Sequence, residues 1–183
     1  MSEKKRTKAD AVSMWQHYQA ALQKRPLQTK AITSAAMGAF GEIVAHGLKH
    51  KSLQGLSLQR ILAFALYSGG ITAPVMHAWY GFLEQCRVRG DRLSNNGKLL
   101  FDRLLLTPPF LALTLFTLSL LTGASVAASK TLVRTKYITA LWMNWKVWTL
   151  TQYLSFNYVP PHLRVLWGNA VAVWWNCYLS LAS

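Results

Sequence analysis

The chain has 183 residues; 52% are hydrophobic and only 14% are charged, against roughly 25% charged residues in soluble globular proteins. Its 20 Lys and Arg residues and six Asp and Glu residues give a net charge of +14, and the basic residues lie between long apolar blocks. This distribution argues against a soluble domain and against a nucleic-acid partner, for which no binding motif is present. It favours basic loops beside the anionic headgroups of a lipid bilayer, which is the first expected partner.

Residues 1–30 form a basic segment of net charge +5, in which apolar residues at helical spacing predict an amphipathic helix on the membrane surface. The helix is expected from Ala11 to Leu27. Glu3 and Asp10 are unlike a cleavable mitochondrial presequence, and the segment has no apolar stretch of the kind that a secretory signal needs. We therefore expect the chain to enter its membrane uncleaved.

Four apolar segments are long enough to cross a bilayer, which takes about 20 helical residues for a hydrocarbon layer about 30 Å thick. They are residues 31–48, 61–83, 99–123 and 162–182. The sequence thus predicts a single four-helix transmembrane domain over residues 31–183. Four spans place both termini on the same side, and the balanced basic charge of the two sets of loops gives no orientation by the positive-inside rule.

A fifth apolar stretch, residues 137–159, is rich in Trp and Tyr but has Lys146 at its middle. Aromatic side chains of this kind favour the headgroup depth of a membrane. We predict an interfacial or re-entrant amphipathic helix before the last span, with a fifth full span as the alternative. The fold class expected is an all-α integral membrane protein.

Small residues and prolines mark special positions within the spans. In the first span, Gly38 and Gly41 fall on one face and predict close approach of a neighbouring helix. Pro74 in the second span and Pro108 with Pro109 in the third each remove a backbone hydrogen bond, so helix kinks are expected there. Carbonyls freed at a kink must face protein or water rather than lipid.

Ionisable residues inside spans are a functional signal, because a charge at the bilayer centre costs roughly 2.5–3.5 kcal/mol on insertion scales. Glu42, with His46 one turn later, lies deep in the first span. These two either line a polar cavity or lock the bundle by a hydrogen bond. Asp102, Arg103 and Arg164 lie near span starts, where snorkelling to the interface is the alternative.

Catalytic sequence motifs are absent from the chain. There is no phosphate-binding glycine loop, nucleophile elbow or zinc-protease helix, the five histidines are scattered, and six acids leave few sites for paired carboxylates. Cys86 and Cys177 are far apart and predict neither a disulfide framework nor a metal site. We expect no enzyme activity, no cofactor and no metal.

The C-terminal third carries a family resemblance. It reads Trp148-x3-Gln152-x3-Phe156-x2-Val159-Pro160-x3-Arg164-x4-Asn169-x5-Trp175-x2-Tyr178-Leu179-Ser180. Upstream landmarks are Pro26-x2-Thr29-Lys30, Gly41-Glu42-x3-His46, Pro74-x2-His77-x-Trp79-Tyr80-x2-Leu83 and Lys98-x3-Asp102-Arg103-x4-Pro108. From about Trp15 onward the chain resembles the twenty-two-kilodalton peroxisomal membrane protein family, which also has mitochondrial inner-membrane members of the Mpv type.

The chain departs from that family's pattern at several landmarks. Glu42 and His46 stand where the family commonly has Asp and Gln, and Ala73 stands where it has Gly before the proline. Thr149 and Leu150 replace a proline that follows the tryptophan. The last difference predicts a straighter helix there and weakens any family-derived idea of gating at that segment.

The resemblance implies a four-span protein that forms, or contributes to, a poorly selective pore for small solutes in an organelle membrane. The run from Phe156 to Pro160, the Asp102–Arg103 pair and the basic N-terminus favour the peroxisomal branch, with the mitochondrial inner membrane as the alternative. The terminal Leu-Ala-Ser is not the Ser-Lys-Leu address of peroxisomal matrix proteins, as suits a protein held in the membrane.

A set of polar residues is expected to line the path or to lock the bundle. They are Glu42, His46, His77, Asp102, Arg103, Gln152, Asn157, Arg164 and Asn169. Basic loops at the two mouths would enrich anionic metabolites. Four helices enclose little room, so the path is narrow or several copies assemble as a homo-oligomer. The competing hypothesis is a structural scaffold of the membrane that conducts nothing.

Overall fold

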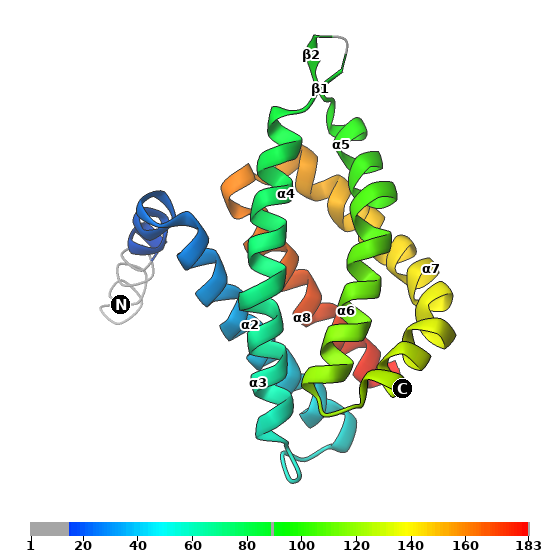
Figure 1. Cartoon of the computed structure of the whole chain (residues 1–183). Helices are drawn as coiled ribbons and strands as arrows, with labels where there is room; N and C mark the ends of the chain where they lie inside the picture. The colour runs from blue at the N-terminus through cyan, green and yellow to red at the C-terminus, as the bar shows by residue number, and fades with distance from the viewer. Residues whose placement is uncertain (1–14, 89, 183) are drawn as a thin grey trace, which may run out of the picture.

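The computed structural model describes residues 15–88 and 90–182, and the side chains of residues 15–87 and 90–174. This part of the chain is helical apart from one short hairpin (Figure 1). Residues 15–24 are helical, and the earlier part of the helix expected from Ala11 lies outside the described residues. The further elements are α2 (Pro26–His50), α3 (Leu58–Tyr67), η1 (Ser68–Thr72), α4 (Ala73–Gln85), β1 (Arg87–Val88), β2 (Asp91–Arg92), α5 (Asn95–Phe101), η2 (Asp102–Leu106), α6 (Thr107–Leu121), α7 (Val126–Tyr158), η3 (Pro161–Leu163) and α8 (Arg164–Ala182).

Local sequence signals explain where the helices begin. Ser57, Ser94 and Ser125 precede α3, α5 and α7, and each hydroxyl accepts a hydrogen bond from a backbone N–H in the first turn. Serine is favoured at this position because it satisfies an N–H that has no partner within the helix. Pro26 occupies the first turn of α2, where the missing N–H costs nothing.

Both proline sites coincide with π-helical turns. The turn η1 ends two residues before Pro74, and η2 ends two residues before Pro108. In each, a backbone N–H bonds the carbonyl five residues back: Ala73 to Ser68, and Thr107 to Asp102. Proline cannot donate the usual bond, and the wider turn re-pairs the neighbouring groups. The runs α3–η1–α4 and α5–η2–α6 are therefore each a continuous helix with one wide turn.

Consecutive helical runs in the first half are antiparallel. Lys30 near the start of α2 contacts His77 in α4, whereas Glu42 farther along α2 contacts Arg60 at the start of α3. The hairpin of β1 and β2 then reverses the chain into α5–η2–α6, which runs beside α3–η1–α4 (Figure 1).

The second half continues this alternation. Ser129 near the start of α7 bonds Ser119 near the end of α6, and Asn157 at the other end of α7 bonds Asn95 at the start of α5. α8 returns along α7 and packs on α2. Asn169 of α8 bonds Ser34 of α2, so the first and last of these helices lie side by side and close the bundle into a ring.

The structure of residues 126–158 differs from the prediction. A separate interfacial or re-entrant helix was expected over residues 137–159, but α7 is one helix of 33 residues that begins at Val126. Its N-cap is Ser125, and the segment contains neither Gly nor Pro, so nothing in it ends the helix before Val159.

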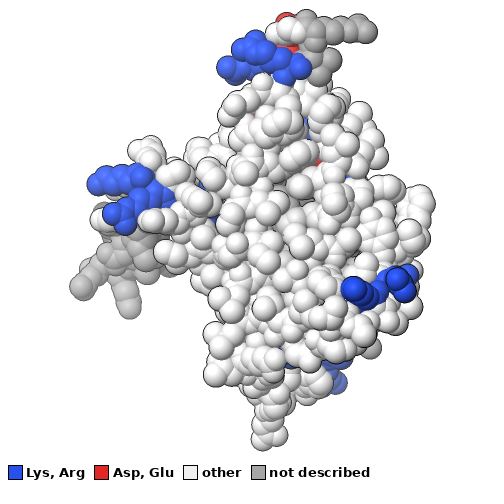
Figure 2. Space-filling model, in the orientation of Figure 1, with Lys and Arg blue, Asp and Glu red and all other residues white. Residues whose placement is uncertain are grey.

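The outer surface of the bundle is apolar. Large hydrophobic side chains exposed on it include Ile32, Phe40, Leu62, Leu66, Leu104, Leu113, Ile138, Trp142 and Leu150. Figure 2 shows one face as a broad area without charge, with Lys and Arg confined to its margins. By length and composition, residues 58–85 and 95–121 of the described chain could each cross a membrane, and they contain the predicted second and third spans almost entirely.

Candidate functional site

A cavity of about 320 Å³ lies inside the ring, between α3–η1–α4, η2–α6, α7 and α8. On the first of these runs its lining follows every fourth residue: Ser68, Thr72, Met76 and Tyr80. Side chains four apart share one face of a helix, so the cavity follows a stripe along the run. From Phe64 to Tyr80 this stripe extends over about 24 Å at 1.5 Å per residue.

An ion-pair cluster closes the bundle at the end where the β-hairpin lies. Arg164 of α8, which lines the cavity, donates from Nη1 to Glu84 Oε1 at 2.5 Å and from Nε to the Val159 carbonyl at 3.2 Å. The second oxygen of Glu84 accepts from Lys98 Nζ at 2.8 Å. The Arg164 guanidinium also lies over the Phe156 ring, 5.0 Å from its centre. These contacts join α4, α5, α7 and α8 at one level.

A second arginine reaches the cavity from the π-helical turn η2. The Arg103 guanidinium pairs with Asp102 Oδ2 and donates to Asn144 Oδ1 of α7 at 3.3 Å. Asp102 is completely buried, and its other oxygen accepts from Trp79 Nε1 of α4 at 2.9 Å. Trp145 Nε1 donates to the Arg103 carbonyl at 3.1 Å. Arg103 and Asn144 line the cavity, whereas Asp102 lies behind the wall.

Tyr80 and Gln152 complete the polar end of the cavity. Gln152 Nε2 donates to the Tyr80 hydroxyl at 3.0 Å, and both side chains are buried. Tyr80 lies within electrostatic range of Asp102, Arg103 and Arg164. The polar groups of four helical segments thus converge on one end of the cavity.

The opposite end of the cavity is mainly apolar. It is lined there by residues such as Phe64, Leu118 and Ala172. Between the two ends, Tyr67 and Thr114 share a hydrogen bond of 2.5 Å across α3 and α6. The cavity therefore changes from charged to apolar along its length.

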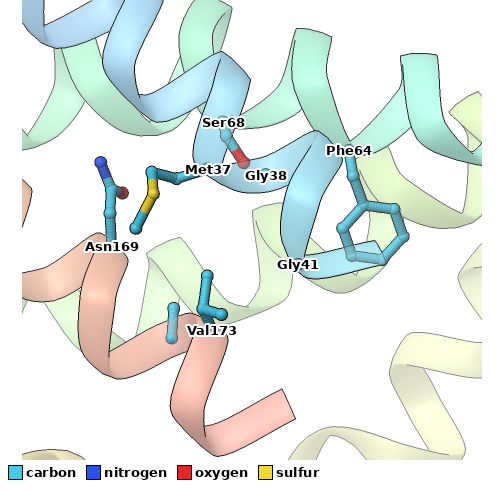
Figure 3. A pocket seen from close by; sticks show the side chains of 8 residues that line it. Met37, Gly38, Gly41, Phe64, Ser68, Asn169 and Val173 are labelled. Carbon is cyan, nitrogen blue, oxygen red and sulfur yellow. The ribbon is translucent and has the colours of Figure 1, made fainter. Parts of the chain in front are cut away.

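A smaller hollow of about 60 Å³ adjoins this cavity between α2, α3, η1 and α8 (Figure 3). Phe64, Ser68, Asn169 and Ala172 line both. Figure 3 shows the Met37 side chain of α2 between α2 and α8, beside Asn169. Gly38 brings α2 close to its neighbour: a Cβ there would lie 2.7 Å from the Phe64 carbonyl oxygen.

Four of the nine polar residues selected from the sequence line the large cavity. These are Arg103, Gln152, Arg164 and Asn169. Asp102 supports this wall through Arg103 without lining it. The other four lie elsewhere, because the sequence pattern does not indicate which face of its helix each residue occupies.

Those four residues have partners of other kinds. Glu42 is buried and pairs with half-exposed Arg60 at 2.6 Å. His46 contacts the Gln54 carbonyl in the loop after α2, and His77 contacts Lys30 at 3.1 Å. Asn157 is exposed near the hairpin end and accepts from Asn95 at 3.1 Å.

Several residues of the cavity wall were not selected from the sequence. Tyr80, Asn144, Thr72 and Thr107 line it, and Glu84 holds Arg164. Their spacing could have revealed them, since polar residues four apart recur on the facing stripes. Glu84 was missed because the predicted span ended at Leu83, one residue earlier.

Comparison with known proteins confirms the resemblance. Residues 119–180 match the Mpv17 / PMP22 family. The chain is 35% identical to peroxisomal membrane protein 2 of Bos taurus, over 85% of this chain and 82% of that protein. It is 34% identical to PXMP2/4 family protein 3 of Dictyostelium discoideum, over 94% of this chain and 91% of that protein.

A mitochondrial relative is also similar: the mitochondrial inner membrane protein Mpv17 of Rattus norvegicus is 29% identical, over 92% of this chain and 97% of that protein. No solved structure matches the chain. The peroxisomal and mitochondrial relatives each cover most of the sequence. The chain belongs to the Mpv17/PMP22 family, whose members are multi-pass proteins of organelle membranes.

Proposed function

We propose that this protein forms a narrow, poorly selective pore for small metabolites across the peroxisomal membrane. The observation that carries the proposal is the cavity of about 320 Å³ inside the helical ring. Its lining extends over about 24 Å of α3–η1–α4, against about 30 Å for the hydrocarbon layer. Such a cavity supports a path for solutes that is shielded from lipid.

The proposal requires the helices around the cavity to cross the membrane together. α7 lies antiparallel to the apolar run of residues 95–121 along its whole length, from Ser129 beside Ser119 to Asn157 beside Asn95. At 1.5 Å per residue its 33 residues extend about 50 Å, which exceeds the bilayer core. We infer that α7 crosses with the others, giving five crossings rather than the four expected from hydropathy.

Lys146 is consistent with five crossings. Tyr137 bonds the Pro108 carbonyl near the middle of the neighbouring run, and Lys146 follows nine residues later. At 1.5 Å per residue it lies about 14 Å nearer the hairpin end, where a Lys side chain reaches the headgroups. The Lys146 charge, which argued against a span over residues 137–159, would therefore lie near the edge of the span that we propose for α7.

Accessibility mapping tests the number of crossings. Five crossings place residues 15–24 and the end of α8 on opposite sides, whereas four place them on the same side. Single cysteines at Gln19 and at Ser183, in a chain with Cys86 and Cys177 replaced by Ser, would be labelled in sealed organelles with an impermeant maleimide. Labelling of one site only supports five crossings, and equal labelling or equal protection of both contradicts them.

The peroxisome is proposed because the identity to the peroxisomal relative is 35%, against 29% for the rat mitochondrial one. The mitochondrial inner membrane is the alternative location. Imaging of the tagged chain against markers of both organelles distinguishes the two.

Efflux from liposomes tests conduction itself. Vesicles carrying the purified protein are loaded with solutes of graded size, from two-carbon acids to disaccharides. A pore of this width releases the small acids and retains the disaccharides. Tight vesicles around folded protein would contradict the pore and favour the scaffold, which should then co-purify with stoichiometric partners.

A further inference from the structure

Two arginines, Arg164 buried and Arg103 partly buried, reach the cavity, and the described residues that line it include no acid. Arg103 and Arg164 both line it, while their partners Asp102 and Glu84 do not. Asp102 lies behind the wall, and Glu84 is partly exposed outside it. Side chains that face the interior therefore present positive charge.

The guanidinium groups retain donors. A guanidinium has five N–H groups. In the described structure Arg164 uses Nε for the Val159 carbonyl and Nη1 for Glu84, which leaves three N–H groups. Arg103 uses three, toward Asp102 and Asn144, which leaves two.

Neutral donors adjoin these arginines. The Tyr80 hydroxyl accepts from Gln152, and its own hydrogen has no acceptor within the described residues other than that amide nitrogen. Tyr80 is 5% exposed and Arg164 4% exposed. An anion in the cavity would accept hydrogen bonds from these donors.

We propose that the end of the cavity formed by Arg103, Arg164, Tyr80, Asn144 and Gln152 is a binding site for one small carboxylate. A carboxylate suits it because its two oxygens match the paired N–H groups of a guanidinium, and Asn144 and Gln152 supply adaptable amides. The volume of about 320 Å³, at the lower end of the range of small-molecule sites, limits the ligand to a small metabolite.

The site deepens the proposed pore, because it places charge selection inside the path rather than at basic loop mouths. The role in selection rests on the pore proposal, whereas binding does not. The positive charge of the two arginines attracts anions into the path and repels cations.

Binding is tested on detergent-purified protein in low-chloride buffer with acetate as the probe. Acetamide, which has nearly the same shape without the charge, is the control ligand. Saturation-transfer NMR should detect acetate and not acetamide. Because a hydrogen bond to a charged group is involved, Tyr80→Phe should weaken acetate binding several-fold and Arg103→Gln about tenfold.

Arg60→Gln is the matched control, since Arg60 pairs with Glu42 away from the lining. It should bind acetate like the wild type. Tyr80→Phe keeps the shape of the ring and so guards against a failure of Arg103→Gln to fold. Equal binding of acetate and acetamide, or unchanged acetate binding by folded Tyr80→Phe and Arg103→Gln, would overturn the site.

Conduction distinguishes the two proposals. In bilayers under a potassium acetate gradient, the wild type should give an acetate-selective reversal potential, and Arg103→Gln should shift it toward potassium. Acetate binding without conductance would preserve the site and refute the pore. Conductance without acetate binding would preserve the pore and refute the site.

Discussion

The α3–η1–α4 run is packed differently on its two sides. Toward α2 it makes contacts that leave no room for a side chain: a Cβ at Gly69 would lie 2.8 Å from the Ala31 carbonyl oxygen and from Ala35 Cβ. Toward the cavity it presents Thr72 and Tyr80 to open space and to the arginines of other helices. At Gly69 the first side is held by close backbone approach, with the Glu42–Arg60 pair farther along α2, whereas the second side is held by paired charges and hydrogen bonds.

This difference indicates which changes each side tolerates. Where α2 crosses η1 at Gly69, added volume is harmful. Along the cavity, added volume is accommodated, but loss of a charge leaves its partner buried and unpaired.

The largest loss of stability is expected from Asp102→Asn. The change leaves Arg103 with a neutral partner in a buried position, and breaking a buried pair costs about 3–5 kcal/mol. The free energy of unfolding in detergent micelles measures this loss. Asp91→Asn in the exposed hairpin is the control and should be neutral. An Asp102→Asn protein as stable as the wild type would show that the pair does not hold the wall.

Gly69→Val should cost about 1–3 kcal/mol, because the added side chain collides with the α2 backbone. Gly81→Ala is the matched control, since a Cβ there meets nothing within 4 Å. Thermal unfolding of both variants measures the difference. Equal melting temperatures would contradict the close contact between α2 and η1.

Tyr67→Phe should cost about 1 kcal/mol, the net contribution of one hydrogen bond, here to Thr114. The ring and its packing remain, so the effect isolates the hydroxyl. Tyr158→Phe, at a position that is 74% exposed, should leave the free energy of unfolding unchanged. A loss of several kcal/mol at Tyr67 would indicate that the hydroxyl does more than join α3 to α6.

The smallest effect on solute flux is expected from Glu42→Gln. Glu42 pairs with Arg60 and is absent from the cavity lining, so efflux from liposomes should be unchanged. A large fall in efflux from folded Glu42→Gln protein would place the solute path on the α2 side of the run.

The all-helical fold and the family follow from sequence features that are local. Apolar length predicted the helical runs, the prolines predicted where they deform, and the motif around Gln152 and Arg164 indicated the family, which the relatives confirm. Local signals also failed once: a separate helix was predicted from Tyr137, although Ser125 and an uninterrupted helix-forming sequence produce one long helix.

The cavity wall was only partly predictable, because it depends on which face of each helix meets which neighbour. His77 is adjacent to Met76, which lines the cavity, yet one residue turns a side chain by about 100° and directs His77 toward Lys30. Glu42 was chosen for its depth, but α2 stands outside the cavity wall. Hydropathy carries no information on such pairing.

The most direct test of the pore is to fill the cavity without disturbing the packing. Gly168 lines the cavity, and a Cβ there meets nothing within 4 Å, so Gly168→Phe should fold and obstruct the path. Gly81→Phe is the matched control away from the lining. Small-acid efflux from liposomes should be fast for the wild type and Gly81→Phe and several-fold slower for Gly168→Phe. Equal efflux from all three folded proteins would contradict a path through this cavity.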